Sequence, residues 1–182
     1  MKFIKEKKFI QIPGIKNQLF TVILFLVMVL SSCGNNQDFG YNEKMTSNFY
    51  SCKERLDERH KKLLAGDFDA DKSSKTAFDM ELKDAKGLGS YCNEIKTEAS
   101  QLGHSEVANV FHEAVIRYMS KIEDEYTVLL TQYVEEQDST ARKAIRTQLE
   151  TKKEELSALE DKCLAAQIAF LKEVGIQINE ET

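Results

Sequence analysis

The chain has a single proline, Pro13, so the rest of it lacks the residue that most often breaks helices and shapes turns. An all-β sandwich needs many short strands joined by turns rich in proline and glycine, and only eight glycines are present among 182 residues. With 42% hydrophobic and 30% charged side chains, the composition is typical of a chain with a packed core. The sequence therefore predicts an all-α protein.

Four amphipathic helical patterns follow one another, with apolar side chains recurring every three or four residues and charged side chains opposite. They cover approximately residues 44–65, 75–102, 105–135 and 139–174. The third pattern starts at Ser105, a favoured N-cap residue. The connections are short, so consecutive helices should be antiparallel neighbours. We expect an up-down-up-down four-helix bundle over residues 44–182; an elongated coiled coil is the alternative, but it would need longer uninterrupted heptads.

The inward positions of these patterns define the predicted core. They include Met45, Phe49, Cys52, Leu56, His60, Leu88, Cys92, Val107, Phe111, Tyr118, Tyr126, Tyr133, Ile145, Leu149, Leu156, Cys163 and Phe170. A histidine on such an apolar face, as at His60, is typical of a partly buried core residue with one hydrogen bond. The opposite faces are interpreted as solvated.

Residues 1–32 have the three-part pattern of a secretory signal peptide. Residues 1–18 carry five lysines and one glutamate, and an uncharged run of 12 residues follows. That run is shorter than the roughly 20 apolar residues that span a membrane. It ends in Leu30-Ser31-Ser32-Cys33, which resembles a bacterial lipobox, where the cysteine thiol receives a diacylglycerol before cleavage. We expect acyl chains such as palmitate at Cys33; an uncleaved N-terminal anchor is the alternative.

Residues 33–43 comprise the cysteine and GNNQDFGYNE, which has no helical period and holds two glycines and three asparagines. They are interpreted as a flexible tether. Gly34 stands where an aspartate would resemble an inner-membrane retention signal, which favours the outer membrane or cell surface. Without residues 1–32 the chain has 20 basic and 29 acidic residues, a net charge of about −9. Such a charge opposes binding to nucleic acid.

Motifs for catalysis or cofactor binding are absent from the sequence. There is no Gly-x-Ser-x-Gly and no glycine-rich phosphate loop. None of the three histidines follows a glutamate by three residues, as di-iron bundles require, and there is no Cys-x-x-Cys-His for haem. We therefore expect no enzyme activity, no cofactor and no catalytic residue.

One loop has the spacing of a calcium site. Its oxygen-bearing side chains at positions 1, 3, 5 and 7 are Asp67, Asp69, Asp71 and Ser73. Lys72 replaces the glycine that an EF-hand turn needs, and Phe78 replaces its final glutamate. The simpler interpretation is an acidic loop whose carboxylates favour the N-terminus of the next helix, with calcium as a weaker alternative.

Three cysteines remain after Cys33, in a compartment that permits disulfides. Counted along the predicted helices, Cys52, Cys92 and Cys163 lie at similar heights on inward faces. Because the first two helices are sequential neighbours, the sequence predicts a Cys52–Cys92 disulfide. Three separate core cysteines are the alternative.

Two segments resemble a family of uncharacterised bacterial surface lipoproteins. They are FHEAVIRYMSKIEDEYTVLL at 111–130 and LEDKCLAAQIAFLKEVGIQI at 159–178. The resemblance implies a helical bundle at the surface or in the periplasm and implies no activity. We expect an interaction or structural module of the cell envelope, held at the membrane by lipid and possessing an envelope protein partner. A carrier of a small ligand or metal ion is the alternative.

Overall fold

The computed structural model describes residues 15–69 and 74–176, with side chains from Gln37 onward. The chain divides into two compact units, Met1–Asn36 and Gln37–Thr182. The described part of the first unit is helical backbone belonging to α1 (Ile15–Ala65). Residues 1–14 of the expected signal peptide and the side chain of Cys33 lie outside what the structure describes. Among the described helices, none has a stretch long and apolar enough to cross a membrane.

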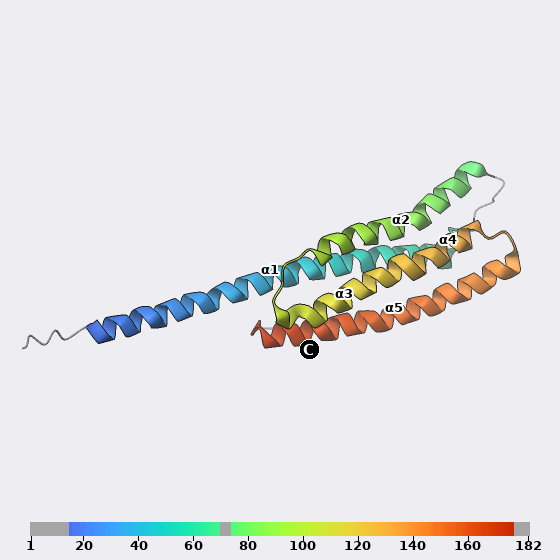
Figure 1. Cartoon of the computed structure of the whole chain (residues 1–182). Helices are drawn as coiled ribbons and strands as arrows, with labels where there is room; N and C mark the ends of the chain where they lie inside the picture. The colour runs from blue at the N-terminus through green and yellow to red at the C-terminus, as the bar shows by residue number, and fades with distance from the viewer. Residues whose placement is uncertain (1–14, 70–73, 177–182) are drawn as a thin grey trace, which may run out of the picture. The chain divides into compact units, whose positions relative to one another are not determined.

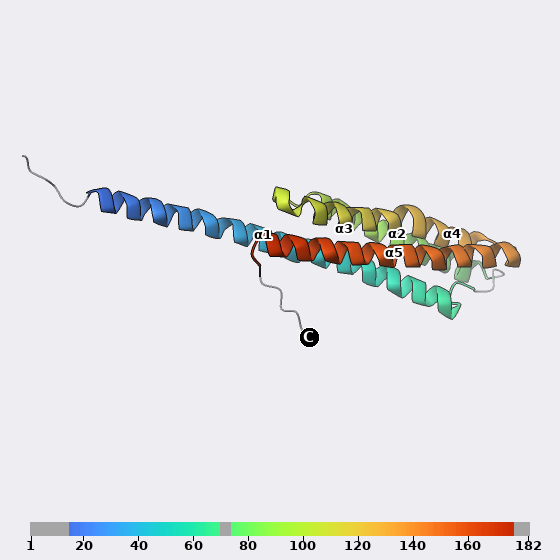
Figure 2. The same ribbon diagram turned by 90° about the horizontal axis from the view of Figure 1, so that it is seen from below.

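The second unit is an all-α bundle of four rods, as the sequence predicts, and the regular structure among its described residues is entirely helical. Figures 1 and 2 show the other helices alongside the later part of α1. The rods are α1 from Gln37, α2 (Lys75–Ser100), α3 (Asn109–Lys121) continued by α4 (Thr127–Glu135), and α5 (Ser139–Glu173).

Neighbouring rods are antiparallel, because residue numbers rise along one as they fall along the other. The paired contacts are Arg55–Tyr91 and Arg59–Asp84 for α1 with α2, Lys86–Glu135 and Lys96–Glu123 for α2 with the third rod, Phe111–Phe170 and Tyr118–Glu160 for α3 with α5, and Thr46–Gln167 and Asp57–Lys153 for α1 with α5. This closed ring of neighbours is the expected up-down-up-down topology.

The predicted inward faces form the core. Most of the positions named above are buried, and Leu56, Leu88, Tyr118 and Leu149 have no exposed surface. Ile145 is half-buried and packs against the core. Val107 is the exception, since it is 36% exposed in the short 3₁₀ turn Glu106–Ala108, where a helical period no longer applies. Ala108 is buried in its place.

Polar residues at the rod ends set where helices begin and end. Ser74 accepts a hydrogen bond from the backbone of Ala77, and Asp138 accepts two at the start of α5, so both are N-caps. Gly66, with φ +82°, ends α1 in the left-handed conformation. Ser105, expected as an N-cap, does precede the third rod, but its side chain makes no capping hydrogen bond.

The flexible tether expected at 33–43 is wrong where the structure describes side chains, because residues 37–43 are helical. Tyr41 is 3% exposed, and its ring packs edge-on against Phe111 and Phe170, with centroids 6.2 and 5.8 Å away. Asn42 accepts a hydrogen bond of 2.9 Å from the side chain of Gln167. Tertiary packing of one aromatic ring therefore overrides the poor helix propensity of the segment.

The third rod is interrupted by a π turn at Ile122–Tyr126, which the sequence pattern did not predict. The backbone N–H and the hydroxyl of Thr127 both donate to the Ile122 carbonyl, the hydroxyl at 2.9 Å. Two α turns take about seven residues. Tyr118, before the turn, and Tyr126, its last residue, are inward aromatic positions eight residues apart. The wide turn therefore absorbs one extra residue and keeps both tyrosines in the core.

Candidate functional site

The loop proposed for calcium is only partly described, because Asp71 and Ser73 lie outside the described residues. Its two described carboxylates have different surroundings. Asp69 accepts a 2.5 Å hydrogen bond from the Tyr133 hydroxyl and lies 3.1 Å from the guanidinium of Arg142. Asp67 instead lines a groove between α1 and α2. Within the described ranges, no three histidine, cysteine or acidic side chains gather as a metal site would require.

The predicted Cys52–Cys92 disulfide is wrong, since both cysteines are free thiols, as is Cys163. The predicted proximity is correct: a hydrogen bond with Cys52, reinforced by burial, raises the pKa of the Cys92 thiol. Matched height on adjacent helices brings two side chains together, but a disulfide also needs a specific Cα separation and dihedral angle. Burial raises the pKa of Cys163 to about 12, so the thiols of Cys92 and Cys163 are poor nucleophiles.

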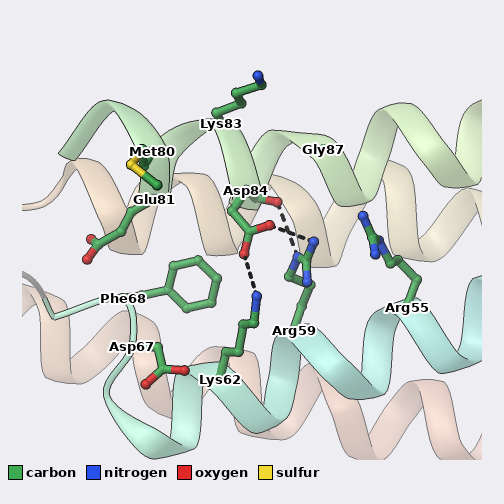
Figure 3. A pocket seen from close by; sticks show the side chains of 10 residues that line it. All are labelled: Arg55, Arg59, Lys62, Asp67, Phe68, Met80, Glu81, Lys83, Asp84 and Gly87. Carbon is green, nitrogen blue, oxygen red and sulfur yellow. Dashed lines mark hydrogen bonds and ion pairs between the residues drawn. The ribbon is translucent and has the colours of Figure 1, made fainter. Parts of the chain in front are cut away.

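One described hollow, the α1/α2 groove, has a volume of about 580 Å³. Figure 3 shows the side chains that reach it from α1, from the turn after α1, and from α2. Phe68 points between the two helices and is buried, whereas Met80 is 68% exposed. The lining residues are Arg55, Arg59, Lys62, Asp67, Phe68, Met80, Glu81, Lys83, Asp84 and Gly87.

The charges at the centre of this groove neutralise one another. Arg59 is buried, and its guanidinium lies 2.5 Å from the Asp84 carboxylate, which also accepts a 3.2 Å hydrogen bond from Lys62 (Figure 3). Glu58 holds the other side of the Arg59 guanidinium at 2.9 Å. Burial would raise the pKa of Glu58, but the charge of Arg59 and its hydrogen bond, together with the charges of Lys62 and Arg55, lower that pKa overall. The groove therefore contains ion pairs that join α1 to α2, and one end of the groove is apolar.

A second hollow, the α3/α5 groove, has a volume of about 340 Å³ and a different charge balance. It is lined by four cations and one carboxylate around an apolar floor, namely Arg117, Lys121, Lys152, Glu155, Leu156, Ala158, Leu159 and Lys162. Glu125, from the π turn, pairs with Lys121 and lies 2.8 Å from Lys152. Hydrogen bonds from these two lysines lower the pKa of Glu125.

Four charged side chains form a closed ring between α1 and α5. Lys53 lies 2.5 Å from Asp57 and 3.4 Å from Glu160, while Lys153 lies 2.9 Å from Asp57 and 3.3 Å from Glu160. Glu160 is 8% exposed and also accepts a 2.9 Å hydrogen bond from the Tyr118 hydroxyl. Burial, followed by the charge of Glu160, raises the pKa of Tyr118. Sequence analysis missed this ring because it assigned such residues to solvated faces.

The histidines bind aromatic side chains of the same bundle. His60 is half-buried and shares a 2.8 Å hydrogen bond with the Tyr126 hydroxyl, which confirms the prediction for this residue. His104 and His112 stack with centroids 4.2 Å apart, and His112 shares a 3.2 Å hydrogen bond with Tyr41. Burial, then the charge of His104, lowers the pKa of His112.

The described residues together form an all-α four-helix bundle with grooves between its helices. No protein-family model, curated protein or solved structure matches this chain. What it binds must therefore be argued from its own residues.

Proposed function

We propose that this chain is a lipid-anchored protein of the bacterial cell envelope, in the outer membrane or at the cell surface, whose bundle serves as an interaction or structural module. The observation that carries the proposal is the lipobox-like Leu30-Ser31-Ser32-Cys33 after a basic and then an apolar segment. Several acyl chains on one cysteine would hold the domain at a membrane without any further contact.

The bundle supports a role based on its surface. Its core is filled by apolar side chains, and the buried Glu160 is bound to groups of the same core. The grooves between helices lie on the outside, where a partner has access to them. A filled interior with grooved faces suits recognition of another macromolecule.

The anchor is tested by labelling cells with a radioactive or clickable palmitate analogue. We expect label on the wild-type chain and none on Cys33→Ser, which should accumulate as a longer precursor because acylation precedes cleavage. Cys163→Ser is the matched control and should keep the label, since its thiol is buried in the bundle. Label that persists in Cys33→Ser would contradict the proposal, and density fractionation of membranes then tests the outer-membrane destination.

A small-ligand carrier is the second candidate, and the α1/α2 groove favours it. Its volume of about 580 Å³ falls within the range of about 300–1,000 Å³ that is usual for ligand sites. Native mass spectrometry of the full chain extracted from membranes would reveal a stoichiometric adduct. An adduct that persists after Met80→Glu, which adds a charge beside the apolar end, would place the ligand elsewhere.

A further inference from the structure

The α3/α5 groove has a charge that the rest of the chain does not lead one to expect. The chain as a whole carries a net charge of −5, yet four cations and a single carboxylate line this groove. In the α1/α2 groove the central Arg59 and Lys62 are bound to Asp84. In the α3/α5 groove Lys121 and Lys152 are likewise bound to Glu125, which leaves Arg117 and Lys162 as its unpaired cations among the described residues. Excess positive charge on an acidic protein is a feature that a negatively charged partner can recognise.

One end of the α3/α5 groove already holds a carboxylate. Glu125 pairs with Lys121 on its own rod and, at 2.8 Å, with Lys152 on α5, so its carboxylate bridges the two helices. Lys152 is held on its other side by Glu155. The chain therefore contains one example of how an acidic side chain sits between these two helices.

The other end has the cations but not the carboxylate. Arg117 and Lys162 are exposed, line the same groove from α3 and α5, and make no ion pair with any described residue. The antiparallel register set by Tyr118 and Glu160 places them at the same level. The half-buried Leu159 lies on the groove floor between the two ends.

The spacing of these cations favours an extended ligand. Lys152 and Lys162 are ten residues apart on α5, which at 1.5 Å per residue is about 15 Å, or nearly three helical turns. A small anion held between Arg117 and Lys162, which lie at the same level, would leave the apolar floor along this length uncovered, whereas an extended ligand with apolar side chains would cover it. Grooves of this kind accept amphipathic helices, whose apolar residues meet the floor while charged residues meet the rims.

We propose that the α3/α5 groove binds an acidic amphipathic helix of a partner protein. Acidic residues of that helix pair with Arg117 and Lys162, and its apolar face covers Leu159. This identification of the partner rests on the proposed role of the chain as an interaction module of the envelope.

The test uses the full chain in neutral detergent and a fluorescein-labelled peptide. The peptide combines leucine at helical spacing with glutamate on the flanks, and binding is followed by fluorescence anisotropy. We expect saturable binding that weakens as salt is added. Arg117→Glu with Lys162→Glu should lower the affinity by about tenfold or more, and Arg117→Gln with Lys162→Gln by less.

The matched control is Lys61→Glu with Lys143→Glu. Both lysines are exposed and make no ion pair with any described residue, and the net charge changes by the same amount. This control should keep the affinity within about twofold, because the charges removed lie outside the groove. Circular dichroism and thermal melting of every variant exclude loss of fold as the cause.

Several results would overturn the proposal. If the variant Arg117→Glu with Lys162→Glu and the matched control lose the same affinity, the peptide is bound by general charge attraction. If a scrambled peptide of the same composition binds as tightly, the ligand in the groove is not an amphipathic helix. Binding of inorganic phosphate or of anionic phospholipid vesicles that depends on Arg117 and Lys162, without peptide binding, would assign the groove to another ligand. Palmitate labelling of the same variants separates the two proposals, because it reports on Cys33 and is independent of the groove.

Discussion

Two glycines of α2, only two residues apart in sequence, should respond to the same substitution in opposite ways. A Cβ added at Gly87 would meet nothing within 4 Å, whereas one added at Gly89 would lie 2.9 Å from Cγ2 of Thr127. Thr127 is not free to turn away, because its hydroxyl donates to the Ile122 carbonyl inside the π turn. Among the described glycines, Gly89 is therefore the one at which an added Cβ would come closest to a neighbouring helix, α4.

The magnitudes follow from these distances. Gly87→Ala should increase the free energy of unfolding by about 0.5–1 kcal/mol, because alanine loses less backbone entropy in a helix. Gly89→Ala gains the same amount but adds an overpacking cost of about 1–3 kcal/mol. The two variants should therefore differ by about 1–3 kcal/mol, which in a chain of this size is about 2–12 °C in Tm.

Urea denaturation followed by circular dichroism measures both variants. In a Thr127→Ala background, which removes Cγ2 and the hydroxyl, the penalty of Gly89→Ala should fall by about half or more, since only the 3.3 Å contact with Cβ remains. If Gly89→Ala stabilises the chain as much as Gly87→Ala does, the close helix approach deduced here is wrong.

Two further predictions concern buried or half-buried polar groups. Glu160→Ala should lower the free energy of unfolding, measured by urea denaturation, by about 2–4 kcal/mol, because it leaves two lysines of the ring without their shared carboxylate. Tyr118→Phe should lower it by about 1–2 kcal/mol. If Glu160→Ala leaves the free energy of unfolding unchanged, solvent screens the ring fully. Burial lowers the pKa of both His60 and His112 below the ordinary 6.5, so the unfolded chain binds protons first as pH falls. The free energy of unfolding should therefore be constant between about pH 7 and 8 and decrease between pH 6.5 and 5. Replacing both histidines by glutamine should flatten this decrease, and an unchanged slope would assign it to other groups.

The helical period was enough to predict the all-α fold, the four rods and their topology. Positions such as Leu56 and Leu149 are buried as the pattern requires, because an apolar side chain every three or four residues leaves the chain one face to bury. The same period located His60 at the edge of the core.

What the sequence could not predict depends on contacts between distant residues. Residues 37–43 have poor helix propensity and are helical because Tyr41 reaches Phe111 and Phe170. The distance between the Cys52 and Cys92 backbones decides whether a disulfide forms, and it cannot be read from matched heights alone. The two grooves likewise arise from which charged faces come to lie side by side, a property that no single helix pattern contains.

The π turn has a consequence for how the length of this protein can vary in evolution. Deleting one residue within an ordinary α-helix rotates everything after it by about 100°, so insertions and deletions are usually confined to loops. At Ile122–Tyr126 the chain already carries one residue more than α geometry needs. Loss of the exposed Asp124 would convert the wide turn to a normal one and leave Tyr126 and Tyr133 facing the core. The third rod thus contains a position, within a helix and not in a loop, where a single codon can be lost while the side chains that face the core keep their places.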